Sequence, residues 1–176
     1  MLDLLYKRRS IRKYKPTKID RDTVQVLLKA ALLSPSSCGL RPWQFVVVDD
    51  SETLSRLAAA KKGAGHLKGA ALAIVVLADP NLSDVWVEDA SIAATILHLT
   101  AESLGLGSCW IQIRKRQYSD TETAEDYVRK ILAVPETLTV ASIMSFGYPA
   151  ESKSPYSEED IKSFSKVYGN RYGSAY

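Results

Sequence analysis

The feature that most constrains this chain is an alternation of helical and strand patterns along its length. Apolar runs that fit buried strands lie at 45–48, 70–78, 108–113 and 139–146. Helical spacing of apolar residues or capping signals predict helices over 2–7, 20–33, 51–60, 84–104, 121–132 and 157–164. We expect Asp20 and Ser51 to cap two of them. The alternation predicts a mixed α and β domain.

The length of the chain favours one domain with its own hydrophobic core. Its 176 residues contain no internal repeat or interdomain linker, so we expect a single domain over residues 1–176. The first residues do not resemble a secretory signal, and the weakly polar stretch 90–101 is too short to span a bilayer. We therefore expect a soluble cytoplasmic protein with no membrane partner, in which Cys38 and Cys109 are reduced thiols.

Two segments have no evident partner inside such a domain. The helix expected at 84–104 is apolar on most of its circumference, which predicts burial at the domain centre or in a subunit interface. The stretch from Val167 to Tyr176 is rich in tyrosine and glycine but has no core of its own. It is expected either to be disordered or to pack on something outside its own domain.

Positive charge is concentrated near the N-terminus. Residues 7–18 carry seven basic side chains and no acidic one, whereas the rest of the chain has 16 basic and 20 acidic residues. In an extended chain Arg8, Ser10 and Arg12 would point to one side and Arg9 to the other. Guanidinium forks and a hydroxyl suit a phosphate group. The alternatives are a solvated basic run and a nucleic-acid site, although no nucleic-acid motif accompanies the charge.

The basic segment resembles the phosphate-binding motif of the nitroreductase family, in which an Arg-x-Ser-x-Arg/Lys run follows a short first helix. The matching residues are Arg8, Ser10 and Arg12. Arg9 stands at a position that commonly contacts the flavin in this family. The resemblance therefore implies that this segment holds the phosphate of FMN.

Two later segments resemble the same family in the expected order. One is a loop that reaches the flavin of the neighbouring subunit in the family; its matching residues are Pro35, Ser36 and Ser37. The other is a strand that lays its backbone beside the reactive edge of the flavin; its matching residues are Trp110, Ile111 and Gln112. Both matches imply roles in cofactor binding.

The last match is Gly-Tyr-Pro-Ala at 147–150, which follows the fourth expected strand. In the family a basic residue after this motif completes the phosphate site, and here that residue is Lys153. His66 lies in a region where members place a polar side chain near the flavin. His98, within the long apolar helix, is expected to be buried and hydrogen-bonded locally.

Taken together, the resemblance implies an α+β fold with a central, mostly antiparallel sheet flanked by helices, and a C-terminal tail exchanged with a dimer partner from about residue 165. It also implies a homodimer with FMN at the interface, NADH or NADPH as electron donor, and a small electron-poor acceptor reduced by a ping-pong mechanism. We expect no essential proton-donating side chain and no metal, because the cofactor carries the redox chemistry.

Other activities remain open at this stage. Family branches that reduce enones, remove halogen from aromatics or break down flavin share the fold that the resemblance implies. A flavin-binding carrier without turnover is a further alternative, and a nucleic-acid binder is a third. The residues do not distinguish NADH from NADPH, nor do they name the acceptor.

Overall fold

The computed structural model describes residues 1–161 and 166–176, and its centre is a four-stranded antiparallel sheet. The strands are β1 (Trp43–Val48), β2 (Leu72–Ala78), β3 (Gly107–Gln112) and β4 (Thr139–Gly147). Their order across the sheet is β1-β2-β4-β3, so β1 and β3 are the edge strands. The register aligns Val46 with Val75 and Trp110 with Met144. This sheet confirms the expected antiparallel α+β architecture.

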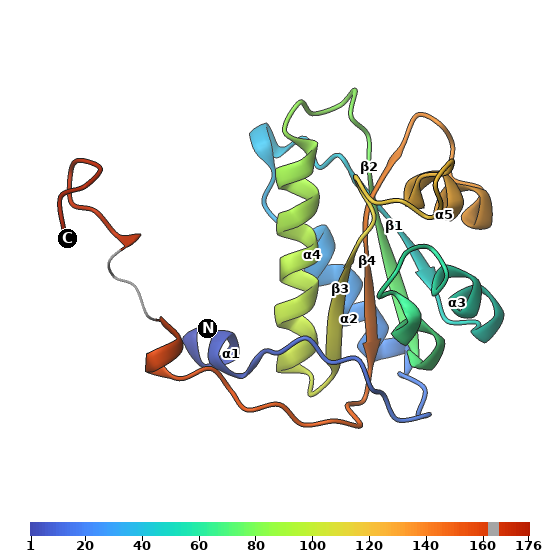
Figure 1. Ribbon diagram of the computed structural model, residues 1–176, viewed down its shortest axis with the longest axis horizontal. Coiled ribbons are helices and arrows are strands. Elements are labelled where there is room, and N and C mark those ends of the chain that lie inside the picture. Colours follow the sequence, from blue (N-terminus) through green and yellow to red (C-terminus); the bar gives the residue numbers. More distant parts are fainter. Residues whose placement is uncertain (162–165) are drawn as a thin grey trace.

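Helices cover both faces of the sheet, as Figure 1 shows with the sheet nearly edge-on. On one face lie α2 (Arg21–Leu32) and α4 (Trp86–Ser103), and on the other lie α3 (Ser51–Leu57) and α5 (Ala124–Leu132). The pleat of the central strand β2 serves both cores: Ile74 and Val76 pack toward α2 and α4, whereas Ala73 and Val75 face α3 and α5. Short 3₁₀ turns lie at Ser37–Gly39 (η1), Gly65–Gly69 (η2) and Glu158–Ile161 (η3).

Helices α2 and α3 both begin after a capping aspartate, although only one of these two caps is the residue that the sequence predicts. The carboxylate of Asp20 accepts a hydrogen bond from the amide of Thr23 at 2.8 Å, which confirms it as the cap of α2. For α3, Ser51 as the cap is wrong: Asp50 accepts from the amide of Thr53 at 2.8 Å, and Ser51 is the first helical residue.

The last expected helix, 157–164, can be compared with the structure only over residues 157–161. Its described part is the 3₁₀ turn η3, not an α-helix, and residues 162–165 lie outside the described part of the chain.

Helix α4 is the long apolar helix that the sequence predicts. One face is buried against the sheet and includes Ala90, Ala94, Leu97 and Ala101, whereas Ile92 on the opposite side is 37% exposed. Burial in the domain core is thus confirmed for one face of the helix, and a subunit interface on the other face stays a prediction. None of the helices in the described part of the chain has the length and apolarity that a bilayer crossing requires.

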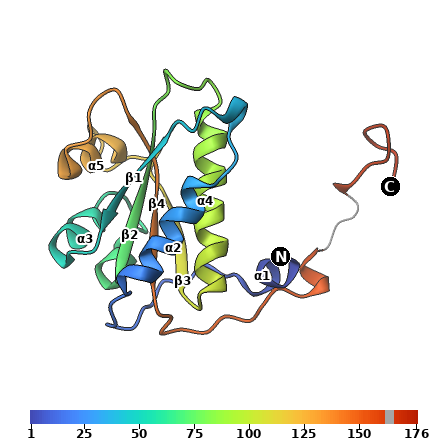
Figure 2. The same ribbon diagram turned by 180° about the vertical axis from the view of Figure 1, so that it is seen from behind.

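Both ends of the chain leave the sheet together. Helix α1 (Leu2–Lys7) lies beside the segment that follows β4, and the amide of Tyr156 donates to the carbonyl of Tyr6 at 2.8 Å. Residues 166–176 lie farther out, away from the sheet, in both Figure 1 and Figure 2. There Tyr168 forms an isolated antiparallel bridge with Ala175, and its ring lies 4.6 Å from that of Tyr172.

Candidate functional site

The basic N-terminal segment crosses the ends of β3 and β4 after leaving α1. Ser10 forms a parallel bridge with Ser108, the second residue of β3, and the amide of Ile11 donates to the Ser108 carbonyl at 3.0 Å. Farther along, the amide of Lys15 donates to the carbonyl of Tyr148 at 2.8 Å. The sheet therefore fixes the backbone of a segment that has no regular structure of its own.

Two glycines permit this close approach. A Cβ atom on Gly107 would lie 2.7 Å from Cγ2 of Ile11, and one on Gly147 would lie 2.8 Å from Cδ1 of Tyr14. Real Cβ atoms essentially never make such contacts, so a larger residue at either position would displace the basic segment.

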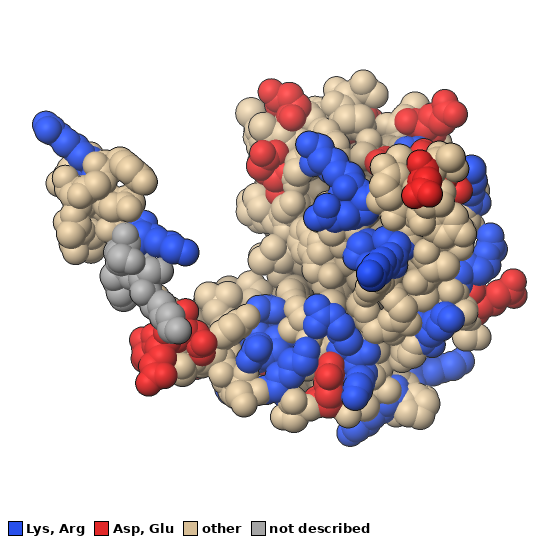
Figure 3. All heavy atoms as spheres, viewed as in Figure 1, with Lys and Arg blue, Asp and Glu red and all other residues tan. Residues whose placement is uncertain are grey.

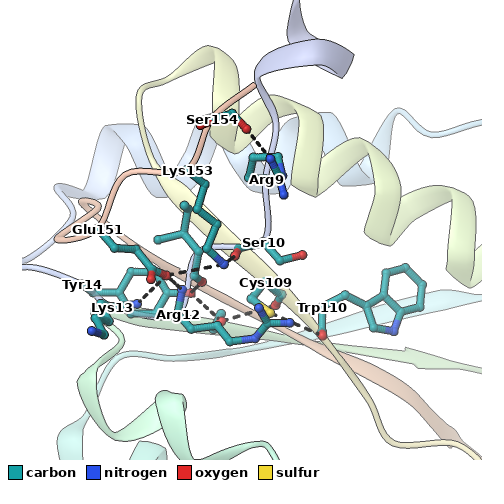
Figure 4. A network of polar contacts seen from close by, with 12 residues as sticks. Arg9, Ser10, Arg12, Lys13, Tyr14, Cys109, Trp110, Glu151, Lys153 and Ser154 are labelled. Atoms are coloured by element: carbon teal, nitrogen blue, oxygen red, sulfur yellow. Dashed lines mark hydrogen bonds and ion pairs between the residues drawn. The ribbon is translucent and has the colours of Figure 1, made fainter. Parts of the chain in front are cut away.

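Residues from opposite ends of the sequence meet at this point (Figure 4). The ammonium of Lys153 donates to the carbonyl of Ser10 at 2.5 Å and lies 3.9 Å from the carboxylate of Glu151. That carboxylate also accepts from the amides of Arg12 at 2.5 Å and Lys13 at 3.2 Å. The amide of Arg12 contributes most to holding the pKa of Glu151 below its ordinary value.

The side chain of Arg12 extends along β3, beside Cys109 and toward Trp110 (Figure 4). Among residues 1–161 and 166–176, no ion pair or hydrogen bond occupies its guanidinium. Burial raises the pKa of the Cys109 thiol, while the nearby charge of Arg12 acts in the opposite direction. Cys109 and the exposed Cys38 are both free thiols, as expected.

The other two arginines of the segment already have partners. Arg8 donates from Nη1 to Nε2 of His98 in α4 at 2.8 Å. Arg9 points away from Arg12, as strand-like alternation predicts (Figure 4); it donates to the carbonyl of Ser154 and lies 4.5 Å above the ring of Tyr156. We call Arg8, Ser10, Arg12 and Lys153 the clamp.

His66, from the turn η2, lies near the clamp. Burial is the main cause that lowers its pKa, and the charge of Arg12 is the second. Its Nε2 atom is buried without a hydrogen-bond partner among the described residues. A buried polar atom of this kind ordinarily has a partner, so His66 is a natural contact for a ligand beside Arg12.

The free edge of β3 continues from the clamp. Because the Ser108 carbonyl faces outward to Ile11, alternation points the backbone groups of Trp110 and Gln112 outward as well. The indole of Trp110 donates to the side chain of Gln112 at 3.0 Å. Ile111 differs: its backbone faces β4, and its side chain, 3% exposed, belongs to the core under α3 and α5.

The loop with Pro35, Ser36 and Ser37 lies elsewhere in the protomer. The amide of Ser37 donates at 2.8 Å to the buried carboxylate of Asp89 in the first turn of α4. His98, which binds Arg8, is nine residues farther along this helix, or about 13 Å at the ordinary helical rise. One protomer therefore does not bring this loop to the clamp.

Sequence reasoning missed two residues of this region, Glu151 and His98. The expectation of a local hydrogen bond for His98 is wrong, because its partners are Arg8 and the Ser108 hydroxyl, from two other segments. The contact between Arg8 and His98 spans 90 positions, so no local pattern could reveal it.

The electrostatic character of the site follows from this arrangement. Figure 3 shows Lys and Arg side chains gathered on the face in front of the sheet, over the N-terminal segment and the end of the sheet that it crosses. A free guanidinium, an ammonium and a hydroxyl suit a phosphate group. The outward backbone groups of β3 could hydrogen-bond a planar polar ring beside it. The donors therefore fit an elongated ligand with a phosphate at one end.

Comparisons with known proteins agree with this geometry. The profile of the nitroreductase family matches residues 5–86 and 58–148. A protein of Archaeoglobus fulgidus, assigned as an NADH dehydrogenase/NAD(P)H nitroreductase, is 39% identical over 163 residues, which cover 90% of this chain and 91% of that protein.

Solved structures show the same likeness. An FMN-dependent nitroreductase from Clostridium difficile R20291 superposes with a TM-score of 0.95 at 49% identity, over 98% of this chain and 100% of that one. The NADPH:FMN oxidoreductase of Vibrio harveyi, complexed with NAD⁺, gives a TM-score of 0.83 at 26% identity, over 97% of this chain and 77% of that one. The chain belongs to the nitroreductase family.

Proposed function

We propose that this protein is an FMN-dependent oxidoreductase that uses NADH or NADPH to reduce nitroaromatic, quinone or similar electron-poor small molecules. The observation that carries the proposal is the junction of the clamp with the free edge of β3. FMN would supply the transfer of a hydride in two half-reactions, with the nicotinamide leaving before the acceptor enters. The names of the relatives, which include FMN-dependent and NAD(P)H-dependent enzymes, support this assignment.

The clamp residues would bind the phosphate of FMN. None of the described residues engages the guanidinium of Arg12, and the Lys153 ammonium retains donors beyond the one given to Ser10. The hydroxyl of Ser10 adds a third donor on the same segment, because Ser10 bridges to Ser108 of β3 two residues before Arg12. Arg9 is committed to Ser154 and Tyr156, so its part is to hold the segment in place, with its backbone near the flavin.

Beside the clamp, β3 and His66 would orient the rest of FMN. The outward backbone groups of Trp110 and Gln112 would meet the polar edge of the flavin ring, and Ile111 would support this edge from the core. The orphaned Nε2 of His66 would complete a polar contact near the phosphate end. We assign no side chain as an essential proton donor.

Two protomers would complete the site. Pro35, Ser36 and Ser37 lie away from the clamp of their own protomer, so we assign them to the flavin of a second one. Apolar side chains exposed on α1 and at the C-terminal end of α2 favour such an interface: Leu2 is 62% exposed, Leu5 46% and Leu33 79%. The tail from about residue 165 would pack on the partner, because Tyr172 and Tyr176 are each 91% exposed in a single chain.

A spectrum of the purified protein tests the assignment. We expect yellow protein, or colourless protein that takes up FMN stoichiometrically, and we expect the bound flavin to bleach when NADH or NADPH is added without oxygen. A panel with a nitroaromatic, a quinone and an enone would then identify the acceptor class by the rate at which each restores the flavin absorbance.

Two results would contradict the proposal in different ways. A protein that takes up no FMN would exclude FMN as the ligand of the clamp. A protein that binds FMN, but whose flavin neither nicotinamide cofactor reduces, is a carrier without turnover.

A further inference from the structure

His98 is a buried group that the proposed function does not use. Its side chain is 9% exposed, and it lies on the inner face of α4 beside the start of β3. Both ring nitrogens have partners: Nε2 lies 2.8 Å from Nη1 of Arg8, and Nδ1 contacts the hydroxyl of Ser108. Through these contacts His98 joins α4, β3 and the basic segment at the clamp.

The chemistry of arginine fixes the role of each ring nitrogen. A guanidinium only donates hydrogen bonds, so Nε2 of His98 must be the acceptor. The imidazole proton is then on Nδ1, which donates to the Ser108 hydroxyl. Burial and the charge of Arg8 lower the pKa of His98 to about 4, consistent with a neutral ring that can accept.

We propose that His98 is a positioning residue of the clamp, which holds the guanidinium of Arg8 in a fixed orientation for a ligand phosphate. Arginine has five N–H donors in a rigid fork. The bond to His98 uses one of them and restrains a long side chain that is half-buried, so the remaining donors are left for a ligand. This inference rests on the proposed function, because it takes the phosphate of FMN as the ligand.

Ser108 links His98 to the backbone of the basic segment. Its hydroxyl oxygen accepts a hydrogen bond from the Nδ1–H of His98, and its backbone forms the bridge to Ser10. The strand residue that holds the His98 ring is therefore the same one that fixes the backbone of the clamp at Ser10. The orientation of Arg8 and the position of Ser10 are set by one common support.

The experiment compares FMN with riboflavin, which lacks the phosphate. The variants are His98→Leu, which has no acceptor, His98→Asn, which is polar but shorter, and His98→Gln, whose side-chain oxygen can accept. Thr95→Ala is the matched control, because Thr95 lies in the same helix and is exposed. Dissociation constants are measured by flavin fluorescence quenching at pH 7.5.

We expect His98→Leu and His98→Asn to weaken FMN about tenfold, the effect of one charge-assisted hydrogen bond, and to leave riboflavin unchanged. His98→Gln should stay within about threefold of wild type by the same scale, and Thr95→Ala should match wild type. In an Arg8→Ala background, His98→Asn should add no further loss, because the residue acts through Arg8. Nitrogen NMR should report the Nδ1–H tautomer in wild type and a shifted Nε2 resonance in Arg8→Ala.

Three results would overturn the inference: equal losses for FMN and riboflavin, additive effects of Arg8→Ala and His98→Asn, or an Nε2–H tautomer in wild type. Failure of the proposed function looks different, because wild type would then bind neither flavin. In that case the same variants are titrated with inorganic pyrophosphate by thermal shift. Protection of wild type but not of His98→Asn supports the positioning role, and equal protection overturns it.

Discussion

At the scale of single residues, the basic side chains of the N-terminal segment differ in what already occupies them. The Arg12 guanidinium has no partner in the part of the chain that the structure describes, Arg8 is restrained by His98, and Arg9 is held by Ser154 and Tyr156. The three arginines carry the same charge, but they should contribute differently to ligand binding. A donor that is already bonded within the protein must break that bond before it can bind a ligand.

Arg12→Ala should weaken FMN binding by about ten- to a hundredfold, the effect of losing charge-assisted hydrogen bonds to the phosphate. Lys15→Ala is the matched comparison, since it removes the same charge from an exposed position of the same segment. It should change FMN affinity by less than about threefold on the same scale. Fluorescence titration with FMN and riboflavin measures both effects. If Lys15→Ala weakens FMN as much as Arg12→Ala does, general electrostatic attraction explains the binding instead.

His98 should make the stability of the fold depend on pH. Its pKa falls from the ordinary 6.5 to about 4 in the folded protein, so the unfolded chain binds more protons between these values. Stability is then fully present above pH 6.5 and declines as the pH falls toward 4, by about 3 kcal/mol at most. Urea unfolding of wild type and His98→Gln across this range measures the difference. Parallel curves for the two proteins would show that His98 does not contribute.

At the scale of the elements, the clamp depends on how closely the basic segment approaches the ends of two strands. Gly107→Ala should displace Ile11, because the new Cβ would lie 2.8 Å from Cβ of that residue. Strain of this kind typically costs about 1–3 kcal/mol, and FMN affinity should fall with it. Gly69→Ala is the control, since a Cβ there would meet nothing within 4 Å. Urea unfolding and FMN titration of both variants test this; an unchanged Gly107→Ala protein would contradict it.

Most elements of the fold could be predicted because their signals are local. Buried strands such as β2 are continuous apolar runs, and α2 begins at the capping carboxylate of Asp20. The start of α3 is harder to locate from the sequence, because Asp50 and Ser51 are adjacent and both residue types cap helices. Their order in the cap depends on backbone angles that no local pattern fixes.

The candidate site was predictable only where its residues form a contiguous motif. The run from Arg8 to Arg12 could be recognised in the sequence, and so could the strand with Trp110. The contacts of Glu151 with the Arg12 amide and of His98 with Arg8 depend instead on packing between distant segments. Chain order alone does not specify such contacts.

At the scale of the whole molecule, a single protomer leaves apolar surface exposed at several places. The edge strand β1 borders a hollow whose apolar lining includes Val24, Val47 and Leu72. The tail at 166–176 extends away from its own sheet (Figure 1). Exposed apolar surface of this kind favours association, and in a symmetric dimer each protomer both offers and receives the same segment.

Deleting residues 165–176 should therefore shift the proposed dimer toward monomer and lower its flavin content. The deletion removes Val167, Tyr168, Tyr172 and Tyr176, whose burial on a partner would contribute a large share of the interface energy. Tyr118→Ala is the control, because this exposed ring stacks on Tyr127 within its own protomer. Light scattering after size exclusion gives the mass, and absorbance gives bound FMN per chain. A truncated protein that remains dimeric with full flavin content would show that the tail has no part in assembly, whereas joint loss of both would place the tail in the interface that retains the cofactor.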